Sequence, residues 1–294
     1  MEYHLPVLSQ ETIDLLDVQS GEVYIDATLG NGGHTLEILK KGGIVYGIDQ
    51  DPNNLKITQE RIKKEGLGKN FFPIHSNFNK LEDIVKNQIK KEISGIIVDL
   101  GLSQNQQKSQ NRGFSFNDTS SLDMRLDPEN QEVTAEMVIN TASFEDLYKV
   151  FTKYGQEVYS KPLILRIITE RQKSPIKSGE RLANIIRDYY KQRNIRTNTD
   201  PSTKIFMSLR ILVNEEFENL RNLLAQTLTS IKSNGRVVII TFHSGEDRIV
   251  KQFIKNSFDN NLITNKSKSV KANHKEVSKN PLSRSATLRS YRII

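Results

Sequence analysis

The chain has 294 residues, enough for one large domain or two domains of ordinary size. It contains no cysteine, which excludes disulfides, thiolate metal sites and cysteine nucleophiles. No apolar run approaches the roughly 18 residues of a membrane helix, and the start of the chain has no secretory signal pattern. With 26% charged and 36% hydrophobic residues, the composition is that of a soluble protein, for which we expect a cytoplasmic location.

The net charge of +7 is concentrated near the C-terminal end of the sequence. Residues 251–294 carry ten lysines and arginines against two acidic residues, whereas residues 1–250 are close to neutral. A basic segment of this kind favours a polyanionic partner such as nucleic acid. A solvated lysine loop would have the same composition, so the charge alone leaves both interpretations open.

Short apolar runs alternate with amphipathic stretches in the first third of the chain. Strands are predicted over residues 23–29, 44–49, 71–75, 95–100 and 236–242, with an edge strand over 288–294. Helices over 35–40, 53–64 and 79–91 separate the first four strands. This alternation predicts a parallel sheet covered by helices on both faces. The fold class is therefore α/β, with a doubly wound, Rossmann-like sheet.

A glycine turn follows the first predicted strand and opens the first of these helices. Gly30, Gly32 and Gly33 allow the backbone to turn tightly and to approach a ligand closely. Asp49 ends the second strand, 19 residues after Gly30, close to the spacing at which an acid binds the hydroxyls of a cofactor ribose. These residues predict a site for a nucleoside cofactor.

The glycine turn does not identify the cofactor. Thr35 stands where the last glycine of the G-x-G-x-x-G fingerprint would be, and no Gly-Lys-Ser/Thr of a P-loop follows. Nicotinamide, flavin and S-adenosylmethionine sites all use such turns. Asp99 ends the fourth strand and would face the reactive end of the cofactor, where S-adenosylmethionine carries a sulfonium and an ammonium group. Asp99 therefore favours a methyltransferase, although a turn or capping acid would occupy the same position.

The strand pattern stops after the fourth strand and resumes late in the chain. Residues 103–131 are polar and predict a long loop, after which helices are predicted over 134–140, 144–154, 157–172 and 180–192. A further helical pattern runs from about 200 to 232, and another opens at Ser244. We therefore expect a discontinuous domain of residues 1–103 and 200–294, interrupted by an all-helical insertion, residues 104–199, as a candidate RNA-recognition domain.

Sequence blocks along the whole chain resemble the bacterial ribosomal RNA small subunit methyltransferase H (MraW) family. The blocks are residues 26–34 (DATLGNGGH), 47–52 (GIDQDP), 99–103 (DLGLS), 112–116 (RGFSF), 122–127 (LDMRLD), 209–216 (LRILVNEE), 242–251 (FHSGEDRIVK) and 284–289 (RSATLR). Several of these blocks are highly specific to the family. The chain departs from the family at residues 103–106, which read SQNQ where the usual sequence is SSPQ.

The resemblance implies methyl transfer from S-adenosylmethionine to N4 of a cytidine in the decoding region of 16S rRNA, within the small ribosomal subunit. It implies cofactor-binding roles for Gly32, Gly33, His34, Asp49, Phe78, Asp99 and Gln106. No metal site is assigned. Alternatives are methylation of another nucleic acid, a nicotinamide-dependent oxidoreductase and an inactive assembly factor, and the protein could be a monomer or a dimer.

The catalytic groups are not assigned from the sequence. An acceptor that holds the cytosine amine with its lone pair towards the methyl group would assist transfer. Asp99, aided by the 112–127 loop or by His243, is our hypothesis for this acceptor and for the base pocket. A structural role for His243 is an equally good interpretation. Variants of His243 and Asp123 would test the hypothesis.

Overall fold

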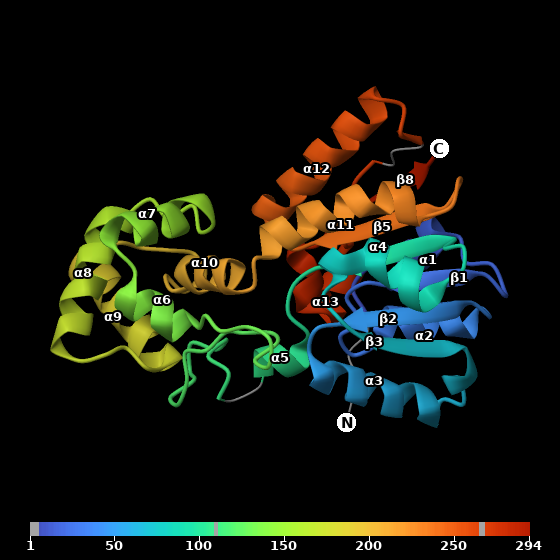
Figure 1. Cartoon of the computed structure of the whole chain (residues 1–294). Coiled ribbons are helices and arrows are strands. Elements are labelled where there is room, and N and C mark those ends of the chain that lie inside the picture. The colour runs from blue at the N-terminus through green and yellow to red at the C-terminus, as the bar shows by residue number, and fades with distance from the viewer. Residues whose placement is uncertain (1–5, 109–110, 265–267) are drawn as a thin grey trace. The chain divides into compact units, whose positions relative to one another are not determined.

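The computed structural model describes residues 6–108, 111–264 and 268–294, which divide into two compact units (Figure 1). Unit 1 consists of Met1–Ser103 and Phe217–Ile294, and unit 2 is Gln104–Glu216. None of the described helices has the length and the apolar character needed to cross a bilayer.

Unit 1 is built on one mixed sheet, which confirms the predicted α/β fold class. The strands are β1 (Val23–Asp26), β2 (Ile44–Asp49), β3 (Phe71–His75), β4 (Gly95–Asp99), β5 (Arg236–Thr241), β6 (Ile263–Thr264), β7 (Val270–Lys271) and β8 (Thr287–Ile293). Their order is β3-β2-β1-β4-β5-β8-β6, with β7 also paired to β8. The first five strands are parallel, and β8 runs antiparallel to β5.

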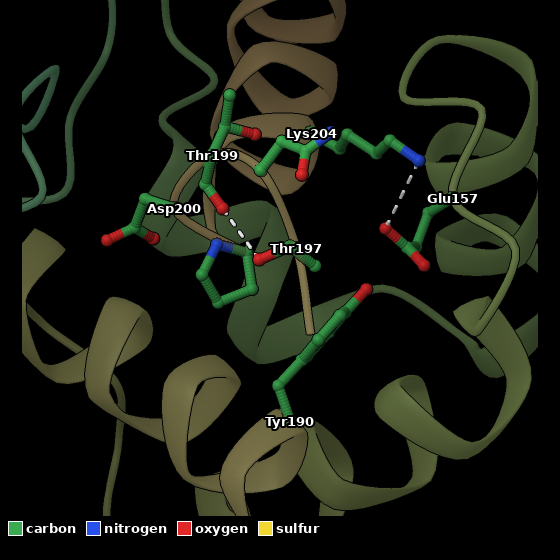
Figure 2. Close-up of a pocket in the computed structure, with 8 residues that line it drawn as sticks. Glu157, Tyr190, Thr197, Thr199, Asp200 and Lys204 are labelled. Atoms are coloured by element: carbon green, nitrogen blue, oxygen red, sulfur yellow. Dashed lines mark hydrogen bonds and ion pairs between the residues drawn. The ribbon is translucent and has the colours of Figure 1, made fainter. Parts of the chain in front are cut away.

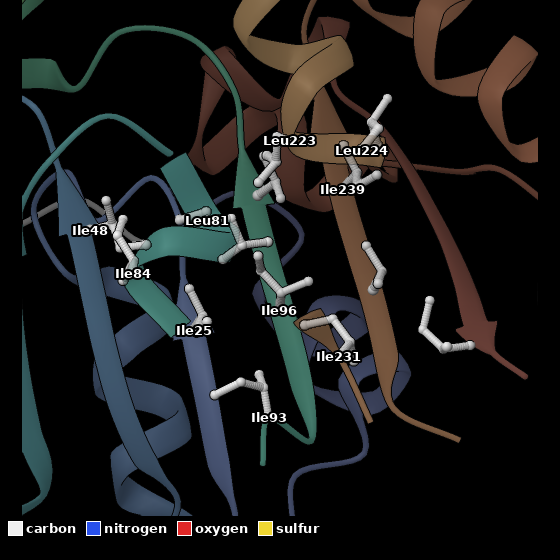
Figure 3. Close-up of a cluster of buried hydrophobic side chains, with 14 of the residues drawn as sticks. Ile25, Ile48, Leu81, Ile84, Ile93, Ile96, Leu223, Leu224, Ile231 and Ile239 are labelled. Atoms are coloured by element: carbon white, nitrogen blue, oxygen red, sulfur yellow. The ribbon is translucent and has the colours of Figure 1, made fainter. Parts of the chain in front are cut away.

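Successive residues of the central strands pack on opposite faces of the sheet. Ile96 and Val98 of β4 belong to one core cluster, while Ile97 belongs to another. This alternation explains the uninterrupted apolar runs, because a strand covered on both faces buries every side chain. Figure 3 shows the first cluster, which includes Leu223 and Leu224 together with Ile239 of β5.

Helices contribute further residues to both clusters. Those of unit 1 are α1 (Ser9–Leu16), α2 (Gly33–Lys40), α3 (Pro52–Lys64), α4 (Leu81–Ile84), α11 (Glu216–Ser230, beginning at the boundary), α12 (Ser244–Asp259) and α13 (His274–Lys279). Shorter turns are η1 (Gly68–Asn70), η2 (Phe78–Lys80), η3 (Val85–Ile89) and η4 (Pro281–Ser285).

Unit 2 has its own hydrophobic core and is helical. Its helices are α5 (Gln104–Lys108), α6 (Ala135–Thr141), α7 (Phe144–Lys153), α8 (Ser160–Lys173), α9 (Gly179–Gln192) and α10 (Thr203–Val213). The predicted insertion ended at residue 199, whereas unit 2 extends to Glu216. The difference arises because Ile205, Phe206 and Leu209 of α10 join the core of unit 2 and pack against α6 and α7.

Two further predictions about elements were wrong. The single helix expected over 200–232 is broken between α10 and α11, where Glu215 adopts a φ of +49° that a continuous helix does not allow. The strand expected at the sheet edge, β8, lies between β5 and β6. The two-residue strands β6 and β7 carry too little pattern to be recognised in the sequence.

Candidate functional site

Most of the predicted cofactor residues of unit 1 lie where β1, β2 and β4 end: Gly32, Gly33, His34, Asp49 and Asp99. In the register of the sheet Asp26 pairs with Gly47 on one side and with Ile97 on the other. The carboxyl ends of the three strands are therefore adjacent, and the turns that follow them share one edge. This is the edge at which ligands bind in doubly wound sheets.

Helix α3 fixes the path of the glycine turn. Gly30 and Gly32 have φ angles of +49° and +70°, a region that favours glycine. The Thr58 hydroxyl donates to the Gly30 carbonyl at 2.9 Å, and the Arg61 guanidinium donates to the Asn31 carbonyl at 2.6 Å. A Cβ on Gly32 would overlap Cγ2 of Thr58. Glycine is therefore required here both by the backbone angle and by the neighbouring helix.

The turn leads directly into helix α2, which begins at Gly33. Gly32 is the N-cap residue and offers no side chain to the first amides of the helix. A Cβ on Gly33 would lie 3.0 Å from Cβ of Pro6, so the segment before α1 covers the start of α2 closely. Uncapped amides at a helix N-terminus can donate hydrogen bonds to an anionic group such as a carboxylate.

Asp49 closes the base of the turn from the end of β2. Its Oδ2 accepts hydrogen bonds from the Gly30 amide at 2.8 Å and from the Asn54 side chain at 3.1 Å, and its Oδ1 accepts from the Asp51 amide at 2.8 Å. A carboxylate has about four acceptor positions, so one on Oδ1 is left for a hydroxyl donor. Burial raises the pKa of Asp49 to about 6, although these donors oppose the shift.

Asp99 and His34 lie together in a second part of the site, beside the one formed by Asp49. His34 Nε2 lies 3.6 Å from Oδ2 of Asp99, and the His34 side chain is almost completely buried. The Asp99 amide donates to the Thr28 hydroxyl at 2.6 Å, which fixes the end of β4 against β1. Within the described residues, both ring nitrogens of His34 and Oδ1 of Asp99 are buried without a hydrogen-bond partner. Oδ1 of Asp99, and the one ring nitrogen of His34 that carries no hydrogen in the neutral ring, could accept hydrogen bonds from a cationic ligand.

Asp26 is a buried acid that the sequence analysis did not single out. It accepts a hydrogen bond from the Thr35 hydroxyl at 2.7 Å and from the Thr28 amide at 3.3 Å. Burial raises its pKa above the ordinary value, against the opposing effects of Thr35 and His34. The signal in the sequence was its position, an acid ending a buried strand directly before the glycine turn. Asp26 connects the turn to the Asp99 side of the site through Thr28.

Phe78 and Gln106 differ in how the structure places them. Phe78 is half-buried in η2, after β3, and packs against the first core cluster. The Asn77 side chain donates to Oε1 of Gln50 at 3.0 Å, which ties this loop to the residue after Asp49. Gln106 is buried in α5 of unit 2, so its contribution to the cofactor site stays a prediction.

His243 has a structural role as the cap of α12. Its Nδ1 accepts hydrogen bonds from the amides of Gly245 at 3.2 Å and Glu246 at 3.4 Å. The buried Glu246 carboxylate accepts in return from the amides of Phe242 at 2.8 Å and His243 at 3.3 Å. This reciprocal pattern is a capping box with histidine in the place of serine or threonine.

Asp123 of unit 2 is committed to an ion pair. Its two carboxylate oxygens accept from Nε and Nη2 of Arg125, both at 2.8 Å. Burial of the carboxyl opposes ionisation, but the bonds to Arg125 prevail and hold the pKa of Asp123 below its ordinary value. Asp123 therefore stabilises the loop that contains it.

A cavity of about 240 Å³ lies within unit 2 (Figure 2). Buried Glu157 and Tyr190 line it, together with residues 197–201 and Lys204, whose Nζ lies 3.9 Å from the Glu157 carboxylate. Burial and the hydrogen bond to Glu157 raise the pKa of Tyr190. None of the predicted cofactor residues lines this cavity.

The chain is similar to known proteins in fold and in sequence. A candidate rRNA methylase from Clostridium thermocellum has a similar structure, with a TM-score of 0.50 over 100% of both chains at 12% identity. This likeness bears on the fold alone.

Relatives named Ribosomal RNA small subunit methyltransferase H are closer in sequence. One from Ehrlichia chaffeensis is 36% identical over 98% of both chains, and one from Halothermothrix orenii is 37% identical over 97% of both chains. The family model described as the MraW methylase family matches residues 1–294. The chain therefore belongs to the MraW methylase family.

Proposed function

We propose that this protein transfers a methyl group from S-adenosylmethionine to N4 of a cytidine in the decoding region of 16S rRNA. The main support is the match to the MraW methylase family over the whole sequence, joined to an acidic edge with unpartnered polar atoms. The substrate is taken to be the small ribosomal subunit, in the cytoplasm, since the related proteins are named for that subunit.

The residues of unit 1 fit the three chemical parts of the cofactor. The turn from Gly30 to Gly33 and the first amides of α2 would hold the carboxylate of the methionine end. Asp99 and His34 would face its ammonium group, since their buried polar atoms lack partners in the described chain. The free acceptor position on Asp49 would take a ribose hydroxyl, and Phe78 would lie against the adenine.

When bound, the cofactor supplies a methyl group that is already strongly electrophilic. The protein is therefore required mainly to position the cytosine amine in line with it. That amine is a weak nucleophile because its lone pair is delocalised into the ring. A carboxylate that accepts a hydrogen bond from the amine orients the lone pair and stabilises the charge that develops. Asp99 is the candidate, while His243 contributes by fixing the start of α12.

The target base must leave its stacked position to reach such an edge. The direct test is transfer of a labelled methyl group to small subunits that lack the modification, followed by nucleoside analysis. N4-methylcytidine as the labelled product is the expected result. Label in another nucleoside would show that the proposed specificity for N4 of cytidine is wrong. Tight S-adenosylmethionine binding without transfer to any RNA would indicate an assembly factor instead.

A further inference from the structure

The last part of unit 1 presents a group of basic side chains that we call the α13 surface: Lys268, Lys271, Lys275, Lys279 and Arg284. All five are exposed. Over the described ranges 6–108, 111–264 and 268–294, no ion pair is found for any of them. The only acidic residue between 260 and 294 is Glu276. The α13 surface therefore carries a strong excess of positive charge.

The α13 surface is held on the sheet, so it differs from a free lysine loop. Strand β7 pairs with β8 through Lys271 and Thr287, and Val270 and Ala272 on either side of Lys271 pack against a core cluster. Because side chains alternate along a strand, this packing turns Lys271 away from the core. Helix α13 follows directly, and Lys275 and Lys279 lie one turn apart on it.

The single acid of this segment anchors it beside the glycine turn. Oε1 of Glu276 accepts a hydrogen bond from the Leu8 amide at 2.7 Å. Two residues earlier, Pro6 lies against Gly33, where an added Cβ would meet it at 3.0 Å. The Glu276 carboxylate is thus held by a backbone amide, and among the described residues it forms no ion pair with the neighbouring lysines, so the segment keeps a net positive charge.

The sheet register places the same segment at the carboxyl edge. Lys271 pairs with Thr287, and Thr287 pairs with Thr241 at the end of β5. The residue before Thr241, Ile240, pairs with Asp99. Lys271 of the α13 surface thus lies one residue beyond the level of Asp99, at the edge that would hold the methyl donor.

We infer that the α13 surface binds phosphates of the rRNA strand next to the target cytidine. This inference rests on the proposed function and names the surface that delivers the substrate. Flexible ammonium groups of one sign are suited to successive backbone phosphates, which carry one negative charge each. The segment that carries these lysines is attached to Leu8 and to β8. The ammonium groups are therefore held beside the site, where they position the RNA in addition to attracting it.

The test compares two triple variants with the same loss of charge. Lys271→Ala/Lys275→Ala/Lys279→Ala removes the centre of the α13 surface. The control, Lys63→Ala/Lys64→Ala/Lys69→Ala, removes three exposed lysines from the end of α3 and from η1, before the start of β3. Affinity for small subunits lacking the methyl group is measured at several salt concentrations, together with affinity for S-adenosylhomocysteine and the KM and kcat of methyl transfer.

Log affinity falls as log salt rises, with a slope of about −0.7 per phosphate contact for a single strand. The loss of three contacts therefore makes this slope shallower by about 2. The affinity that wild type loses between about 50 and 200 mM salt then exceeds the loss in the α13 variant by about 20-fold. We expect this result with a raised KM, an unchanged kcat and unchanged S-adenosylhomocysteine affinity. The control variant should behave as wild type.

Equal salt slopes in wild type and the α13 variant, or equal weakening in both variants, would overturn the inference. So would a tenfold loss of S-adenosylhomocysteine affinity in the α13 variant, because the lysines would then act through the glycine turn. Failure of wild type to methylate small subunits would instead refute the proposed function. A salt-dependent binding difference between the two variants would still support the α13 surface in that case.

Discussion

The proposed ribose site at Asp49 predicts that cofactor binding is sensitive to acid. In the free protein burial raises the pKa of this carboxyl to about 6, well above its ordinary value. In the proposed complex ribose hydroxyls would donate hydrogen bonds to the ionised form, so binding should lower the pKa of Asp49 and release a proton. The affinity should therefore reach its full value well above pH 6 and fall as the pH drops through the pKa of Asp49 in the free protein.

The size of the effect follows from that pKa. When the bound form titrates well below pH 5, the apparent affinity is divided by one plus the ratio of protonated to ionised Asp49. Relative to pH 7.5, this gives about a twofold loss at pH 6 and about a tenfold loss at pH 5. At pH 6 about half a proton is released for each ligand bound.

Titration calorimetry with S-adenosylhomocysteine, in two buffers of different ionisation enthalpy, measures the affinity and the number of protons released between pH 5 and pH 7.5. Asp49→Asn should bind more weakly and lose this pH dependence. His34→Gln serves as the control, because it removes a titratable ring from the same edge and should leave the Asp49 titration in place. Constant wild-type affinity from pH 7.5 to pH 5, or proton uptake on binding, would refute the reasoning.

Three further outcomes are expected. Gly32→Ala should lower the free energy of unfolding in urea by about 2–4 kcal/mol, because of the positive φ angle and the overlap of the new Cβ with Thr58. Adding Thr58→Ser should restore part of this stability, since serine lacks Cγ2. Asp99→Asn should weaken the binding of S-adenosylhomocysteine by about 10- to 100-fold but leave the binding of 5′-methylthioadenosine, which has no ammonium group, unaffected. Equal losses of affinity for both ligands would exclude a pairing of Asp99 with the ammonium group. Glu246→Ala should cost about 1–3 kcal/mol of stability by leaving two capping amides unbonded, whereas His243→Asn keeps a good cap. A loss of methyl transfer in His243→Asn with stability intact would then assign its ring to the substrate.

The parallel core of the sheet and the position of Asp49 followed from the sequence. Strands β2 and β3 have the predicted bounds, because each is a short apolar run bounded by turn residues. The hydrogen bond from the Gly30 amide to Asp49 follows from adjacent parallel strands, whose carboxyl ends meet. Local pattern and fold class together were sufficient for these features.

Contacts between distant segments were not predictable in this way. Nothing in the residues around Gly32 indicates that Thr58 fills the space where a Cβ would lie, or that Pro6 covers Gly33. Such contacts depend on how α3 and the segment around Pro6 pack against the glycine turn. No short sequence pattern indicates packing between segments that are distant in the chain. The break after α10 was missed because the apolar period continues across Glu215, whose backbone angle leaves no trace in hydrophobicity.

The discontinuity of unit 1 has a consequence for the order in which the protein folds. Ile240 of β5 pairs with Asp99 of β4 across 141 positions of sequence, and all of unit 2 lies between them. Helical contacts close over short loops, whereas this pairing requires closure of a very long one, which slows folding. Unit 2 can therefore assemble during synthesis before β5 exists. The edge proposed to bind the methyl donor is then completed late, so we expect no cofactor binding by an emerging chain until β5 pairs with β4 beside Asp99.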